Sequence, residues 1–300
     1  MCRTYRLWYT WLSLLVMITI PTTALAQASG AGRGSLATSI RTRAHSQERD
    51  VTPPDVYARV TLLQDEIDLI RFEMGRPTPF PGDIEVVDVA PHEVYFQAQT
   101  LLKKSNRLNF EHTREVTEAP QPPHGEATPA DVMVVIDHAL DRIRHVKEKL
   151  GITAPSDQPP PDPSRTPTDV FQAIVQANRQ VNLLLEQRFS PADVYEQMTL
   201  AIAYAARLRA QFPGHRMPKT PALVRGKRPV DVYRKLLDCF AIIRGIAKRS
   251  HLSTLSLTVR QQDHAQVRPS DVYDIVTLLV AELAYLHAQI DNAPAPRPAY

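Results

Sequence analysis

A short motif, Pro-x-Asp/Glu-Val-aromatic, recurs seven times along the chain, with Met133 in place of the aromatic in the third copy, and constrains its fold more than any other feature. Counted from acid to acid, successive copies are 38, 38, 38, 24, 38 and 40 residues apart. A period of this size is typical of chains built from one repeated structural unit. The seven motif acids are Asp55, Glu93, Asp131, Asp169, Asp193, Asp231 and Asp271.

The motif has the features of a helix start. Four copies carry Thr or Ser before the proline, where a hydroxyl can accept a bond from a free backbone N–H. Proline suits the first helical position, and an acid at the third position can close a capping box and is favoured by the helix dipole. The sequence therefore predicts helices that start near residues 52, 90, 128, 166, 190, 228 and 268. We interpret the seven acids as helix caps rather than as a row of metal or substrate ligands.

Apolar residues follow each acid at positions +1, +5, +8, +12, +15 and often +19. Alternating steps of four and three place them on one stripe of an α-helix, as in packed helical bundles. The stripe predicts an all-α fold, a seven-helix repeat bundle or solenoid-like array. Cys239 lies on the stripe, which favours a small buried side chain over a nucleophile.

The predicted helices differ in how apolar they are. The second has Ser105 in its stripe and Lys103 and Lys104 beside it, so we expect it at the edge of the fold. The fifth and seventh are apolar around much of their circumference, which is typical of buried helices, so we expect both to be central.

The linkers between helices are rich in proline and mostly 15 to 18 residues long. A 22-residue helix is about 33 Å long, whereas an extended linker of this length spans up to about 50 Å. Each linker can therefore run back along a helix and start the next one in the same direction. The junction at Phe189 and Ser190 is the exception and predicts a tight antiparallel hairpin or a sharp bend. Residues 83–89 and 254–259 alternate apolar and polar, which predicts half-buried extended segments or short strands.

The N-terminal residues 1–26 have the pattern of a signal peptide. Arg3 and Arg6 precede the apolar run Leu7–Ile20, and Ala24-Leu25-Ala26 matches a cleavage site. We therefore expect a periplasmic or secreted protein with no transmembrane segment after cleavage. The expected organisation continues with a flexible segment at 27–50, the helical repeat domain at 51–291 and a Pro-rich tail at 292–300.

Composition and motifs exclude several classes of function. A formal net charge of +3 on 300 residues argues against nucleic-acid binding. The sequence contains no phosphate-binding glycine loop, no G-x-S-x-G and no H-E-x-x-H. His138 and His145 lie on one helix face around Asp141, which we interpret as a surface face rather than a metal site. We expect no catalytic residue, metal or cofactor.

These observations favour a non-enzymatic binding or scaffold protein of the cell envelope, with a protein partner there. The alternative is a small-ligand receptor or enzyme that uses a cleft between helical layers. A polar strip of Gln176, Asn178, Arg179 and Asn182 would contact either a neighbouring helix or a ligand. Helix capping does not explain the motif tyrosines, which we expect to form a structural layer; a binding surface is the alternative. They are Tyr57, Tyr95, Tyr195, Tyr233 and Tyr273.

Overall fold

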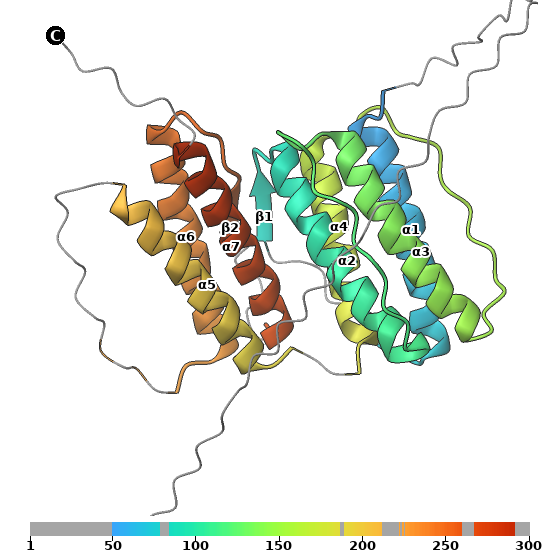
Figure 1. The fold of residues 1–300 in the computed structure, drawn as a ribbon. Coiled ribbons are helices and arrows are strands. Elements are labelled where there is room, and N and C mark those ends of the chain that lie inside the picture. The colour runs from blue at the N-terminus through green and yellow to red at the C-terminus, as the bar shows by residue number, and fades with distance from the viewer. Residues whose placement is uncertain are drawn as a thin grey trace, which may run out of the picture. The chain divides into compact units, whose positions relative to one another are not determined.

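The computed structural model describes residues 50–78, 84–186, 189–211, 222, 224, 226–259 and 267–291. The expected signal peptide, almost all of segment 27–50 and the tail 292–300 lie outside the described residues. The all-α prediction is confirmed, because the described chain is mostly helical (Figure 1). Its elements are α1 (Pro53–Glu73), β1 (Ile84–Val87), α2 (Pro91–Thr113), α3 (Pro129–Lys149), α4 (Pro167–Leu184), α5 (Pro191–Ala210), α6 (Pro229–Arg249), β2 (Ser256–Val259) and α7 (Pro269–Asp291).

Every one of these helices begins at a motif proline. The motif carboxylate accepts a hydrogen bond from the N–H of the residue three positions before it, at 2.5 to 2.9 Å. In α3, α4 and α5 the hydroxyl of Thr128, Thr166 or Ser190 also accepts the N–H of the motif acid at 3.3 Å. These bonds satisfy N–H groups that have no partner within the helix.

Helices α1 to α4 form a bundle in which all four helices run in the same direction. Helix α1 packs on α3 and α4, and α2 packs on the same two helices. At one end, the motif prolines and valines of all four helices line a single small apolar hollow. The linkers 114–128 and 150–166 run back along the bundle to that end (Figure 1). The four positive helix ends thus lie together, and each carries its own motif carboxylate, which offsets the aligned dipoles.

Helices α5, α6 and α7 form a second group that runs in the opposite direction to α2. Within it, α5 and α6 both pack on α7. Phe189 stacks on Tyr273 at the start of α7, and Tyr204 meets His287 near its end, so α5 and α7 are parallel. The junction after α4 therefore reverses the chain direction. It does not form a packed hairpin, because α5 lies against α7 rather than α4.

The two strands form a small antiparallel sheet beside α4 and α6. Ile84 pairs with Val259, and Val87 pairs with Ser256. The prediction of extended segments in these two linkers is confirmed.

The predicted places of two helices are wrong. Helix α2 is central rather than peripheral: it contacts α3, α4 and α7 and buries Lys104, Ser105 and Asn109. Helix α5 is peripheral rather than central: its buried residues are only Ala201 and Leu208. The alanines of α5 reflect high helix propensity rather than burial, whereas Lys104 is buried because an acid on α7 neutralises it. Helix α7 is central to the second group, as expected.

Candidate ligand-binding cleft

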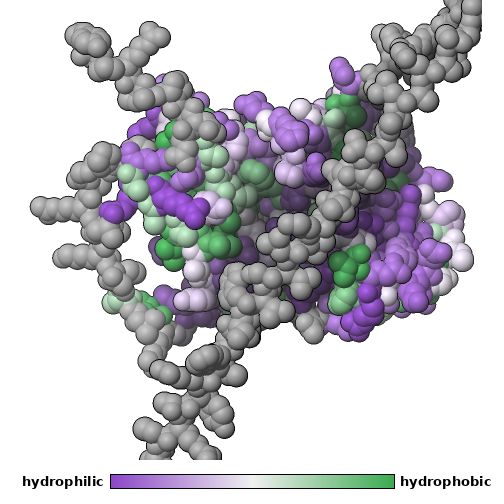
Figure 2. Space-filling model, viewed as in Figure 1, coloured by the Kyte–Doolittle hydropathy of each residue, from purple (hydrophilic) through white to green (hydrophobic). Residues whose placement is uncertain are grey.

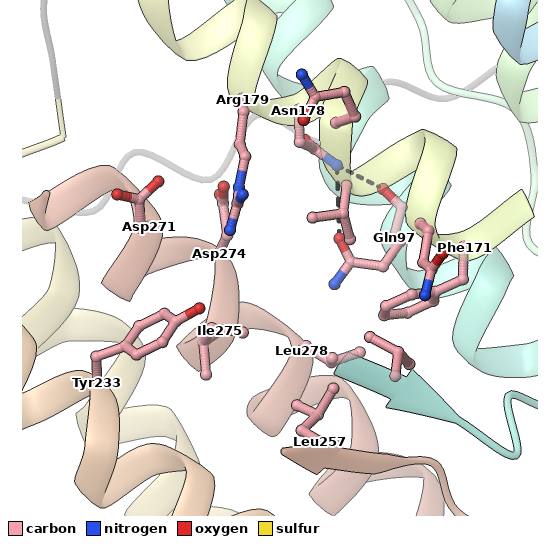
Figure 3. A pocket seen from close by; sticks show the side chains of 14 residues that line it. Gln97, Phe171, Asn178, Arg179, Tyr233, Leu257, Asp271, Asp274, Ile275 and Leu278 are labelled. Carbon is pink, nitrogen blue, oxygen red and sulfur yellow. Dashed lines mark hydrogen bonds between the residues drawn. The ribbon is translucent and has the colours of Figure 1, made fainter. Parts of the chain in front are cut away.

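A cavity of about 170 Å³ lies where the two helix groups and the strands meet (Figure 3). Helices α2, α4, α6 and α7 and both strands contribute to its wall. The polar lining residues are Gln97, Gln172, Gln176, Asn178, Arg179, Tyr233, Asp271 and Asp274. The apolar lining residues are Val86, Phe171, Val175, Leu257, Ile275 and Leu278.

Helical periodicity explains why these residues converge. On α4, Phe171, Val175 and Asn178 are spaced by four and three residues and share one face. On α7, Asp274 and Leu278 follow the same spacing. Helices α4 and α7 thus each present polar and apolar residues to the cavity.

Charged groups gather at the polar end of the cavity. Arg179 points toward Asp271 and Asp274 (Figure 3). Burial raises the pKa of Asp271, while the N–H of Arg268 and the positive charge of Arg179 act in the opposite direction. Asp274 is held on both oxygens, one by the ammonium of Lys104 and the other by the Asn182 side-chain amide at 3.1 Å. Burial lowers the pKa of Lys104, and Asp274 opposes that shift. The charges at this end are therefore fixed in place before any ligand arrives.

Asn178 supplies an acceptor that lacks a protein partner. Its side-chain nitrogen donates weakly to the carbonyl and side-chain oxygens of Gln97, at 3.4 and 3.5 Å. Asn178 is only 1% exposed, and within the described chain its Oδ1 accepts no hydrogen bond. Buried polar atoms are nearly always hydrogen-bonded, so an acceptor of this kind beside a cavity calls for a water molecule or a ligand.

The motif tyrosines do not come together at one place. Tyr233 is 1% exposed and lines the cavity. Tyr57 lies under the guanidinium of Arg165, 4.4 Å from its ring centre. Tyr95 is buried, and its hydroxyl accepts a bond from the Gln99 amide at 2.7 Å. Tyr273 stacks on Phe189, and Tyr195 is 74% exposed. The opposite directions of the two helix groups separate the rings of α1 and α2 from those of α5, α6 and α7.

The other candidates from the sequence lie away from the cavity. His138 and His145 are both half-buried on α3, and His145 lies 3.7 Å from Glu115. Cys239 is a half-buried free thiol packed against the core, and burial raises its pKa. Three of the four polar-strip residues of α4, namely Gln176, Asn178 and Arg179, do line the cavity, and Asn182 anchors Asp274.

Sequence reasoning missed Gln97, Lys104 and Asp274. Each is a polar residue beside an apolar stripe, a pattern that exposed helices share. One signal was present for Asp274, since it is a second acid, three residues after the motif acid, in a largely apolar helix.

No protein-family model, curated protein or solved structure matches this chain. None of the described helices is both long and apolar enough to cross a membrane.

Proposed function

We propose that this protein is a receptor for a small polar ligand, which binds in the cavity between the two helix groups. The observation that carries this proposal is the buried Oδ1 of Asn178, which accepts no hydrogen bond from the described residues and lies beside a cavity of about 170 Å³. A few placed polar groups over an apolar wall are typical of small-molecule sites.

The charges of the cavity favour a neutral or zwitterionic ligand. Asp271 and Asp274 face Arg179, and Lys104 neutralises Asp274 from the side. A ligand with one net charge would leave an uncompensated charge in a buried place, which is costly. Asn178 Oδ1 calls for a ligand donor such as an amine, amide or hydroxyl, and the side chains of Phe171, Ile275 and Leu278 would contact an apolar portion.

Binding fits the lining better than catalysis does. Among the described residues of the cavity wall there is no histidine, cysteine or serine. Its two aspartates could act as general bases, but both already accept hydrogen bonds: Asp271 from the N–H of Arg268, and Asp274 from Lys104 and Asn182.

The proposal is tested by screening small neutral and zwitterionic metabolites for an increase in melting temperature, followed by calorimetric titration of the hits. Asn178→Leu should weaken binding of a hit by at least about tenfold, the effect of losing roughly one good hydrogen bond. Tyr195→Ala is the control. It truncates an exposed side chain that does not line the cavity, so this variant should bind as wild type does. Equal affinity in the Asn178→Leu variant would place the ligand elsewhere and contradict the proposal.

A second candidate function, a protein-binding scaffold, has its own observation. Helix α5 exposes Tyr195, Leu200 and Ile202, and α6 exposes Ile242. Figure 2 shows hydrophobic surface over the region that α5 and α6 occupy. Exposed apolar patches often mark interaction sites. Capture of an envelope protein by the wild type but not by an Ile202→Lys variant would support this function.

Export and repeat construction are further parts of the proposal. We propose that residues 1–26 direct export and are removed, and that the helical domain is built from a repeated unit of one helix and its linker, 38 residues long in four of the six spacings. The order of basic, apolar and small residues at the N-terminus supports export. The recurring helix-start motif supports the repeat. Cell fractionation with N-terminal sequencing tests the first: a mature chain that starts at Gln27 in the extracytoplasmic fraction is expected.

A further inference from the structure

One imidazole and two carboxylates converge between α2 and α7, away from the lining of the cavity. His92 and Glu93 lie in the first turn of α2, and Glu282 lies on α7. One potential ligand atom from each lies within 4.8 Å of the others. Nε2 of His92 is 3.9 Å from Oε1 of Glu282 and 4.0 Å from Oε1 of Glu93. No other described group of His, Cys, Asp and Glu side chains comes together in this way.

Glu282 has no partner that would justify its burial. Its side chain is 0% exposed, and neither carboxylate oxygen accepts a hydrogen bond from the described chain. Nε2 of His92 likewise makes no hydrogen bond. The neighbouring positions on this face of α7, Leu278, Leu279 and Leu286, are apolar and buried. Buried charges in proteins are paired or coordinate a metal, and among the described residues no Lys or Arg forms an ion pair with Glu282.

The other two groups are held in place. The His92 ring stacks on Tyr285 with centroids 4.2 Å apart, and its edge meets Phe96 at 5.6 Å. Glu93 accepts the N–H of Ala90 on one oxygen and the N–H of Leu255 on the other. Each carboxylate oxygen keeps a second lone pair, so these bonds orient Glu93 without using up its capacity as a ligand.

The sequence also departs from its repeat at this point. Glu93 is the one motif acid that is Glu, and in this copy alone a histidine precedes the acid. A Glu reaches one methylene farther than Asp, so Glu93 caps its helix and extends to Glu282 as well. Helix capping explains the acid in all copies, but it does not explain His92.

We propose that His92, Glu93 and Glu282 form a buried binding site for a divalent transition-metal ion, with zinc as the best fit. Imidazole nitrogens and carboxylate oxygens are both zinc ligands, and two negative charges balance the charge of the ion. Calcium and magnesium prefer six or more oxygen ligands, which this site does not supply.

On zinc binding, the ligand atoms need to move only slightly closer together. Ligand atoms around a tetrahedral zinc ion lie about 3.3 Å apart, given zinc–ligand distances of about 2.0–2.1 Å. The present separations of 3.9 and 4.0 Å close by side-chain rotation. The His92 side chain is 12% exposed, so an ion would reach the site from solvent past this residue.

The test is a zinc titration of protein purified from expression of the full chain and stripped with a chelator. Isothermal calorimetry with zinc chloride should give one equivalent per chain, with a rise in melting temperature. Glu282→Gln and His92→Gln should each weaken this binding at least about 100-fold, since losing even an outer partner of a ligand costs about 10–100-fold. Cobalt chloride should give intense visible absorption bands in the wild type, as expected for a four-coordinate ion.

The matched control is His145→Gln, which removes the α3 histidine of a more exposed pair that it forms with Glu115 of the linker after α2. It should keep the full stoichiometry and affinity. Circular dichroism of each variant establishes that the helices remain formed. Absence of a one-equivalent site in the wild type, or its persistence in folded Glu282→Gln protein, would overturn the proposal in favour of carboxyls that are simply protonated. Loss of the site in His145→Gln would overturn it as well, because the metal would then lie on α3.

Discussion

Lys104 in the middle of α2 forms an ion pair with Asp274 near the start of α7, and this pair ties the two oppositely directed helix groups together. Lys104 is 2% exposed, so its ammonium is almost completely removed from water. Asn182 of α4 donates to the second oxygen of Asp274, so three helices meet at this carboxylate.

Removing one partner of this pair should destabilise the protein more than removing both. Lys104→Met leaves Asp274 buried without its cation and should lower the free energy of unfolding by about 3–5 kcal/mol. The double variant Lys104→Met/Asp274→Leu removes both charges and should recover most of that loss. Urea unfolding followed by circular dichroism measures both. A double variant as unstable as the single one would show that packing, and not the lone charge, sets the penalty.

Two tyrosines at the same motif position should respond in opposite ways to truncation. Tyr233 is 1% exposed and Tyr195 is 74% exposed. Tyr233→Ala should lower the free energy of unfolding by about 3 kcal/mol, as for other buried aromatics. Tyr195→Ala should change it by less than about 0.5 kcal/mol. Similar losses in both variants would mean that another part of the protein covers Tyr195.

Helices α3 and α6 end in the same way with different residues at the critical position. Gly151 (φ 73°) and His251 (φ 58°) both adopt the left-handed conformation. In each case the next residue donates its N–H five residues back, from Ile152 to Lys147 and from Leu252 to Ala247. Only glycine adopts this conformation without steric strain.

Substitutions at Gly151 and at His251 should therefore change the free energy of unfolding in opposite directions. Gly151→Ala should destabilise the protein by about 1 kcal/mol, and His251→Gly should stabilise it by a similar or smaller amount. Thermal unfolding monitored by calorimetry detects both changes. A destabilising His251→Gly substitution would reveal a contact of the imidazole that outweighs the backbone strain.

The helix caps should contribute to acid sensitivity. The hydroxyl of Thr166 and then its N–H lower the pKa of Asp169. A lowered folded-state pKa means that Asp169 stabilises the fold fully above the ordinary carboxyl pKa. That contribution is lost as pH falls through the lowered value, within about pH 5 to 2.

Asp169→Asn should consequently be less stable than wild type at pH 7 and should lose less stability on acidification. Thr166→Ala keeps the backbone bond to the carboxylate and should give an intermediate pH dependence. Unfolding free energies at several pH values test this series. Parallel curves for wild type and Asp169→Asn would rule out a role for this cap in acid unfolding.

The sequence predicted the helices well because their signals are local. A proline, an acid three residues after the cap and an apolar stripe each act within a few turns, and every motif copy begins a helix in the structure. The extended segments were also predictable, since alternation of apolar and polar residues over four residues is a local pattern as well.

The positions of the helices and the cleft depend on pairings that no local pattern encodes. The sequence around Lys104 does not reveal whether its side chain faces water or Asp274, which lies 170 residues later in the chain. Helix α5 carries enough apolar residues for a central place, yet it contacts α7 and leaves Ile202 64% exposed. Of the candidate site, the polar strip of α4 and Tyr233 were predictable as polar or aromatic features, while their partners on α2 and α7 were not.

The shared starting end of α1 to α4 has a consequence for how quickly this chain folds. Helical bundles that fold fast do so by closing neighbouring helices into hairpins, with contacts between residues close in sequence. Here no two successive helices of the bundle are joined by a short turn, so they cannot pair as a hairpin. Helix α1 packs on α4, more than 100 residues later in the chain. Refolding should therefore be slower than in an up-and-down bundle of equal size, and partly folded chains should expose their apolar stripes for longer.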